Sequence, residues 1–100
     1  MLGFIKNLLG LGPKVDVKAL IKSGAKVVDV RTPAEYRQGH VKGSINIPLQ
    51  TISSQLSKLK KEDTIITCCA SGMRSGAAKR VLKSHGFENV HNGGTWMSLQ

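Results

Sequence analysis

Four short segments rich in apolar and β-branched residues alternate along this chain with segments of helical spacing, and this alternation restricts the possible folds. The predicted strands cover residues 26–30, 44–47, 64–68 and 89–91. Strands that alternate with helices form a parallel sheet that is covered on both faces. Because ligands bind such sheets at the carboxyl ends of the strands, we expect an α/β domain with its site at one of these ends.

The segments between the strands carry helix signals. Asp16 and Thr32 are predicted N-caps, and Glu35 completes a capping box with Thr32. The last predicted helix covers residues 75–85 and is followed by Gly86. The predicted buried faces consist of apolar residues at helical spacing: Val17, Leu20, Ile21, Ile52, Leu56, Leu59, Ala78, Val81 and Leu82.

The chain has 100 residues, enough for one hydrophobic core. We expect an N-terminal extension at residues 1–13 and one domain over residues 14–100. Apolar spacing within the extension predicts a short amphipathic helix over residues 1–9. Lys6 interrupts that apolar stretch and no small-residue cleavage site follows, so we predict no secretory signal and a cytoplasmic location. No apolar run has the length of a membrane span, so we expect no stable membrane insertion.

The net charge of +9 is large for a chain of this length. It is consistent with a solvated basic surface, an acidic protein partner or a small anionic substrate. The lysines are spread along the chain, and only 4% of the residues are aromatic. Nucleic-acid binding usually needs a clustered basic surface or aromatic stacking platforms, so we predict no nucleic-acid partner.

Both cysteines are adjacent in sequence, at Cys68 and Cys69. Neighbouring Cα atoms lie about 3.8 Å apart, closer than the roughly 4.4–6.8 Å that a relaxed disulfide prefers. His40, His85 and His91 lack the paired spacing of a zinc site. We therefore expect two reduced thiols, no metal and no cofactor.

Chemistry is best supported between a predicted strand and helix, from Cys69 to Arg74. A cysteine attacks as its thiolate, and a helix N-terminus favours that anion through unpaired N–H groups. Gly72 lets successive N–H groups point inward, and Arg74 adds a permanent charge that suits an oxyanion. Cys69 is therefore the candidate nucleophile, whereas Cys68, within a central strand, is predicted to be an inert core thiol.

This segment resembles the active-site loop of the rhodanese sulfurtransferases, and it reads Cys69-Ala70-Ser71-Gly72-Met73-Arg74-Ser75. A second signature of the same family is similar to residues 29–48, in the expected order and at the expected distance. Gly93-Gly94 with Trp96 resembles the usual end of the family's domain. The resemblance covers the chain from about Val15 onward.

The resemblance implies a mainly parallel, five-stranded sheet flanked by helices on both faces. It also implies that Cys69 takes a sulfane sulfur from thiosulfate or a persulfide donor, becomes a persulfide, and passes the sulfur to cyanide or a thiol. In this interpretation Arg74 holds the anionic donor, and a sulfur-acceptor protein is a possible partner. The predicted substrate-binding residues are those of the loop: Ala70, Ser71, Gly72, Met73, Arg74 and Ser75.

Other polar residues near the two signatures are predicted to tie loops together and not to touch substrate; they are Asp29, Arg31, Glu35 and His40. Met73 and Trp96 fit either a pocket wall or ordinary packing.

Two alternatives remain open. Counted from Cys68, the spacing to Arg74 is that of a rhodanese-like cysteine phosphatase. The loop counted from Cys69 is one residue shorter than a phosphate needs, and only this register aligns Gly72 with the sulfurtransferase pattern. The second alternative is a non-catalytic binding module on the same fold.

Overall fold

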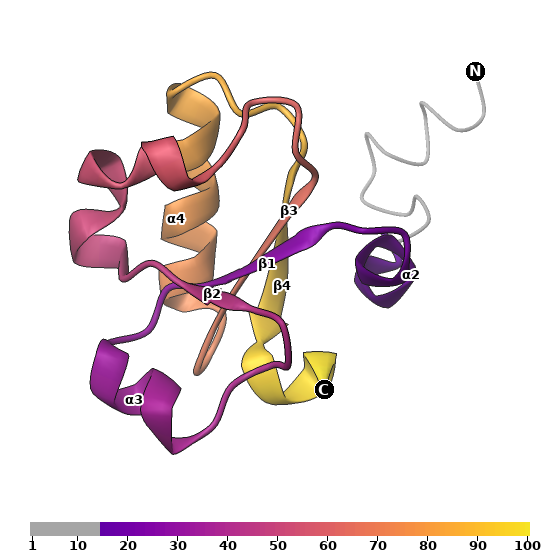
Figure 1. The fold of residues 1–100 in the computed structure, drawn as a ribbon, viewed down its shortest axis with the longest axis vertical. Helices are drawn as coiled ribbons and strands as arrows, with labels where there is room; N and C mark the ends of the chain where they lie inside the picture. The colour runs from indigo at the N-terminus through magenta and orange to yellow at the C-terminus, as the bar shows by residue number, and fades with distance from the viewer. Residues whose placement is uncertain (1–14) are drawn as a thin grey trace.

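The computed structural model describes residues 15–100, which form a four-stranded sheet in the order β2-β1-β3-β4 (Figure 1). The strands are β1 (Lys26–Asp29), β2 (Ile45–Asn46), β3 (Ile65–Cys69) and β4 (Val90–Thr95). All three strand pairings are parallel. The α/β class, the parallel sheet and the four strand positions expected from the residues are confirmed, with shifts at the strand ends.

The family resemblance implies a fifth strand. That prediction is wrong for the described residues, whose sheet has four strands. Before β1 the chain forms helix α2 (Val17–Lys22), because the Asp16 side chain accepts a hydrogen bond from the Ala19 N–H at 3.1 Å. After β4 the chain turns at once into the 3₁₀ helix η3 (Trp96–Leu99). Neither of these two segments pairs with a sheet edge.

Helices α3 (Pro33–Gln38) and α4 (Met73–Ser84) follow β1 and β3. The capping box of α3 is present as predicted, with Thr32 and Glu35 bonded in both directions. Helix α4 begins two residues earlier than predicted, because Gly72 turns the chain as its N-cap. The loop between β3 and α4 is therefore shorter than the sequence indicates.

The helix predicted across Ile52, Leu56 and Leu59 is instead two 3₁₀ helices, η1 (Leu49–Ser54) and η2 (Leu56–Lys58). The two meet at Gln55, whose φ of −119° is not helical. Serine hydroxyls favour such short turns by bonding nearby carbonyls, as Ser54 does with Thr51 at 2.8 Å. Ile52 and Leu59 still reach the core.

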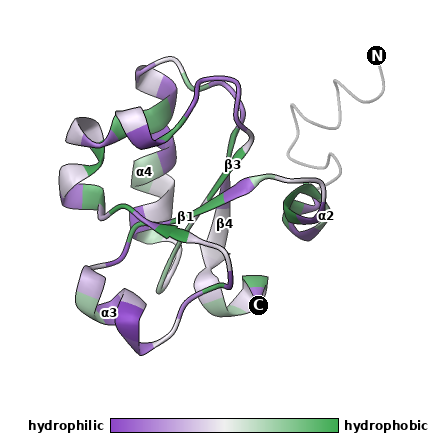
Figure 2. Ribbon diagram, in the orientation of Figure 1, coloured by the Kyte–Doolittle hydropathy of each residue, from purple (hydrophilic) through white to green (hydrophobic). Residues whose placement is uncertain are grey.

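Two apolar clusters lie on opposite faces of the sheet, so helices cover both faces as expected. One cluster joins the sheet to α4, η1 and η2, and includes Val28, Val30, Ile47, Ile52, Leu59, Ile65, Cys69, Ala78, Leu82, Phe87 and Val90. The other joins the sheet to α2 and η3, and includes Val27, Val41, Ile66, Cys68 and Leu99. Figure 2 shows apolar residues, in green, within β1 and β3, the two central strands of the sheet. The first cluster is the larger and carries the candidate nucleophile.

Within residues 15–100, no helix is both long and apolar enough to cross a bilayer. The predicted extension at 1–13 and its amphipathic helix lie outside the described residues.

Candidate active site

The two cysteines occupy opposite faces of β3. Successive side chains of a strand point to opposite sides, so Cys68 and Cys69 enter different apolar clusters. Both side chains are fully buried. Cys69 is the last residue of β3, at the carboxyl end of a central strand, where the sequence predicts the site.

Backbone N–H groups of the loop converge on the Cys69 sulfur. The N–H of Gly72 donates to Sγ at 2.9 Å, and the N–H of Ser75 donates at 3.3 Å. This geometry depends on Gly72, whose φ of +96° lies in the left-handed region. The first turn of α4 thus directs otherwise unpaired donors at the sulfur.

The surroundings of Cys69 favour its thiolate. Burial by itself raises the pKa of the Cys69 thiol, but hydrogen bonds from the Ser75 side chain and from the backbone of Ser75, Ser71 and Gly72 outweigh that effect. The pKa of Cys69 therefore lies below its ordinary value. For Cys68 the effect of burial dominates and raises the pKa of its thiol to about 12. Of the two cysteines, Cys69 has the electrostatics of a nucleophile.

A hydrogen-bond network from β4 supports the loop, and the sequence pattern does not predict it. Asn92 Oδ1 accepts from the Ser75 hydroxyl at 2.6 Å, and Asn92 Nδ2 donates to the Gly72 carbonyl at 3.2 Å. Ser75 Oγ lies 3.4 Å from the Cys69 sulfur. Asn92 thus fixes two groups that surround the candidate nucleophile. An asparagine 17 residues beyond Ser75 gives no sequence signal, since only the pairing of β3 with β4 brings it there.

The glycine pair of β4 permits this approach. Between Thr67 and Cys69 the β3–β4 register shifts, and Gly93 and Gly94 lie in the shifted stretch. A Cβ on Gly93 would lie 2.7 Å from Ile66 Cγ2 and 3.0 Å from the Thr67 carbonyl oxygen. A side chain at Gly93 would clash with β3, so glycine is required where the register shifts.

Arg74 forms a two-pronged ion pair with Glu35. Nη1 and Nη2 of Arg74 donate to the two carboxylate oxygens at 2.7 and 3.0 Å, linking α4 to α3. Hydrogen bonds from Arg74 and from the Thr32 backbone lower the pKa of Glu35 to about 2. Glu35 was predicted to tie loops together, and it does so by contacting a loop residue that was predicted to bind substrate.

Asp29 and Arg31 form a buried ion pair at the carboxyl end of β1. Arg31 Nη2 donates to Asp29 Oδ2 at 2.7 Å and to the Gly39 carbonyl at 2.6 Å. The Trp96 ring covers the guanidinium, with the Arg31 Cζ 4.5 Å from the ring centroid. These contacts hold the segment after β1 in place, in agreement with a structural role for Asp29 and Arg31.

The remaining candidates lie at the surface. His40 is exposed and stacks on Tyr36, with ring centroids 3.8 Å apart. Met73 is 80% exposed at the start of α4. Ala70 and Ser71 are also exposed, so the loop has one face on solvent and the other on the sulfur. Among residues 15–100, no cluster of His, Cys, Asp and Glu could hold a metal ion.

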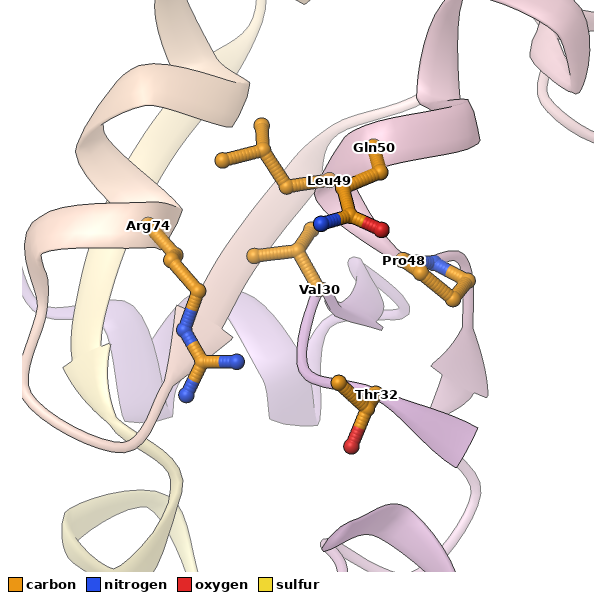
Figure 3. Close-up of a pocket in the computed structure, with 6 residues that line it drawn as sticks. All are labelled: Val30, Thr32, Pro48, Leu49, Gln50 and Arg74. Atoms are coloured by element: carbon orange, nitrogen blue, oxygen red, sulfur yellow. The ribbon is translucent and has the colours of Figure 1, made fainter. Parts of the chain in front are cut away.

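A cavity of about 290 Å³ opens beside Arg74 (Figure 3). Arg74 reaches into it from α4, and the segments that follow β1 and β2 supply the other walls. The lining residues are Val30, Thr32, Pro48, Leu49, Gln50 and Arg74. Val30 and Leu49 also pack in the same apolar cluster as Cys69. The cavity and the sulfur therefore lie on the same face of the sheet.

Known proteins are similar to this chain in sequence and in fold. A family model described as a rhodanese-like domain matches residues 14–94. The thiosulfate sulfurtransferase PspE of Escherichia coli is 41% identical over 69 residues, 67% of this chain and 66% of its own length. Against four curated relatives, the chain spans 66%, 36%, 54% and 62% of the relative's length.

Solved structures are also similar to this chain in fold. A human single-domain sulfurtransferase superposes with a TM-score of 0.77 at 27% identity, covering 89% of this chain and 98% of its own. A rhodanese-related protein from Thermoplasma volcanium gives a TM-score of 0.74 at 33% identity, covering 84% and 83% respectively. The chain therefore belongs to the rhodanese-like family.

Proposed function

We propose that this protein is a sulfurtransferase that carries sulfane sulfur on Cys69. One observation supports this most directly: the buried Cys69 sulfur accepts hydrogen bonds from the N–H groups of Gly72 and Ser75 at the start of α4. These donors favour a thiolate before the reaction and a terminal sulfur anion after it. The name of the Escherichia coli relative supports thiosulfate as a donor.

The proposed reaction has two displacements. The Cys69 thiolate attacks the outer sulfur of thiosulfate, the S–S bond of thiosulfate breaks, and sulfite leaves with the electron pair. The product is a Cys69 persulfide, whose outer sulfur then forms a bond to a thiophilic acceptor such as cyanide or a thiol while Cys69 leaves as thiolate. Each step transfers one sulfur atom and needs no external oxidant or reductant.

We propose roles for the loop residues that its geometry supports. Backbone N–H groups from Ala70 to Ser75 would surround the outer sulfur of the persulfide. Two of the five N–H groups of the Arg74 guanidinium donate hydrogen bonds to Glu35. The other three can donate to an anionic sulfur-donor molecule. We propose a small anionic sulfur donor and a sulfur-acceptor protein as partners, and the cytoplasm stays the predicted compartment.

Intact-mass measurement after incubation with thiosulfate tests the proposal. We expect a gain of one sulfur, about 32 Da, in the wild type and in Cys68→Ala, and no gain in Cys69→Ala. Cys68→Ala is the matched control, because it removes a neighbouring thiol on the other face of β3. Labelling of Cys69→Ala at the wild-type level would overturn the assignment.

The mass measurement, combined with an assay of p-nitrophenyl phosphate hydrolysis, separates the two alternatives. A phosphatase using Cys68 would hydrolyse p-nitrophenyl phosphate, but the Cys68 side chain is buried on the face away from α4 and its pKa is raised to about 12. A non-catalytic module would take up no sulfur from any donor. Sulfur uptake on Cys69 without phosphate release would exclude both.

A further inference from the structure

The cavity beside Arg74 lies where the chain reverses direction across the sheet. From β1 the chain moves to β2 on one side, and it then returns to form β3 on the other side of β1. Val30 directly follows β1, and Arg74 lies in the first turn after β3. Small ligands of open α/β sheets bind at such a crevice, outside the carboxyl ends of the strands.

The walls of this cavity are mostly apolar. Val30, Pro48 and Leu49 offer hydrocarbon surface, while Thr32 and Gln50 add neutral polar groups. An inorganic anion would leave the apolar walls without a partner, whereas a small organic group would fill them. The size of the cavity, about 290 Å³, suits a ligand with a short aliphatic or aromatic group.

Among the described residues that line the cavity, Arg74 alone is charged, and its charge is already balanced. Arg74 contributes one positive charge, and the paired Glu35 carboxylate contributes one negative charge at 2.7 Å. A ligand with a single negative charge can use the N–H donors of Arg74 that Glu35 does not take. A second negative charge would approach Glu35 without a cation to offset it.

We propose that this cavity binds the organic group of a singly charged sulfane-sulfur donor, and that Glu35 is a specificity-determining residue that disfavours doubly charged inorganic donors. This inference rests on the proposed sulfurtransferase function and specifies its donor class. A donor of the form R–SO₂–S⁻ has the required chemistry, with R in the cavity and the outer sulfur at Cys69.

The reaction with such a donor is balanced. The Cys69 thiolate forms a bond to the outer sulfur of R–SO₂–S⁻ as the S–S bond of the donor breaks. The sulfinate R–SO₂⁻ leaves with the electron pair, and Cys69 holds the outer sulfur as a persulfide. No external oxidant or reductant is needed.

Three donors separate the effects of charge and size. Thiosulfate and methanethiosulfonate differ mainly in net charge, two against one. Methanethiosulfonate and benzenethiosulfonate have the same charge and leaving chemistry but differ in the size of R. The measurement is kcat/KM for persulfide formation at fixed ionic strength, followed by the release of sulfite or sulfinate.

Glu35→Gln tests the charge effect. Glutamine keeps an oxygen that can accept the Thr32 N–H, so the capping box of α3 survives. We expect the ratio of kcat/KM for thiosulfate to that for methanethiosulfonate to rise about fivefold or more. Glu88→Gln is the matched control: it removes the same charge from an exposed position that precedes β4, at the other end of the sheet, and should leave the ratio unchanged. An equal change in both variants would overturn the role of Glu35.

Leu49→Ala tests the cavity independently of Glu35. Shortening this wall should lower the preference for benzenethiosulfonate over methanethiosulfonate about fivefold or more. An unchanged preference would place the organic group elsewhere and overturn the inference. Failure of all three donors to form a persulfide would instead refute the proposed function itself.

Discussion

Ser75 contacts the proposed nucleophile, Cys69, through both its backbone and its side chain. Its N–H donates to Cys69 Sγ at 3.3 Å, and its hydroxyl oxygen lies 3.4 Å from the same atom. Both contacts lower the pKa of Cys69 and so counter the effect of burial. The rate of persulfide formation should therefore rise with pH through a pKa below that of an ordinary thiol, and then level off.

Ser75→Ala should move that inflection to higher pH and slow persulfide formation at neutral pH. The variant keeps the backbone N–H but loses the hydroxyl, whose proton stabilises the Cys69 thiolate when it turns from Asn92 Oδ1 to Sγ. A pH profile of kcat/KM checks this, with Ser71→Ala as the control because Ser71 lowers the pKa of Cys69 through its backbone. A profile for Ser75→Ala that coincides with the wild type would contradict the role of the hydroxyl.

Arg74→Ala should lower kcat/KM for thiosulfate at least tenfold, or about 1.4 kcal/mol in transition-state stabilisation. Lysine should rescue the loss only in part, since it lacks the planar fork. Arg80→Ala removes an exposed cation from the same helix and should have little effect. Steady-state kinetics measure all three, and an unimpaired, folded Arg74→Ala protein would refute the proposed contact with the donor.

At the scale of elements, the turn from β3 into α4 depends on one backbone conformation. Gly72 has φ +96°, and a Cβ there would lie 3.6 Å from Gly94 Cα, an ordinary contact. Substitution by alanine therefore strains the backbone without a steric clash, at a cost of about 1–2 kcal/mol in unfolding free energy. Any relaxation of the strain moves the Gly72 N–H away from the Cys69 sulfur.

Gly72→Ala should therefore lose both stability and the rate of persulfide formation. Gly24→Ala is the matched control, because Gly24 also has a positive φ, +107°, and a Cβ there would meet nothing within 4 Å. That variant should lose comparable stability and keep its activity. Chemical unfolding and mass-monitored sulfur uptake measure the two effects, and a fully active Gly72→Ala protein would show that the loop tolerates a different path.

At the scale of the whole molecule, the family match begins at residue 14 and the site is built from β1, β2, β3, β4, α3 and α4. Among residues 15–100, the site contacts described above come from these elements, from the segments between them and from Trp96 of η3. Deletion of residues 1–12 should therefore leave thiosulfate sulfurtransferase activity within about threefold, under roughly 0.7 kcal/mol in barrier. Kinetics and circular dichroism on the truncated protein test this; a folded but inactive truncation would show that the segment helps to form the site.

The sequence by itself determined the features that depend on near neighbours. The alternation of strands and helices, the caps at Asp16 and Thr32, and the position of Cys69 before a glycine turn all appear in the structure. Periodicity, capping and turn chemistry act over a few residues, so they can be predicted from a linear sequence. The different environments of Cys68 and Cys69 follow from the same rule, since alternate residues of a strand face opposite sides.

Only the tertiary structure decided the contacts that join distant segments. Glu35 and Arg74 are 39 residues apart, and Ser75 and Asn92 are 17 apart. Their pairing depends on strand order, on the bulge in β4, and on the angle at which α3 and α4 leave the sheet. These contacts depend on how whole elements pack together, which a linear pattern does not encode.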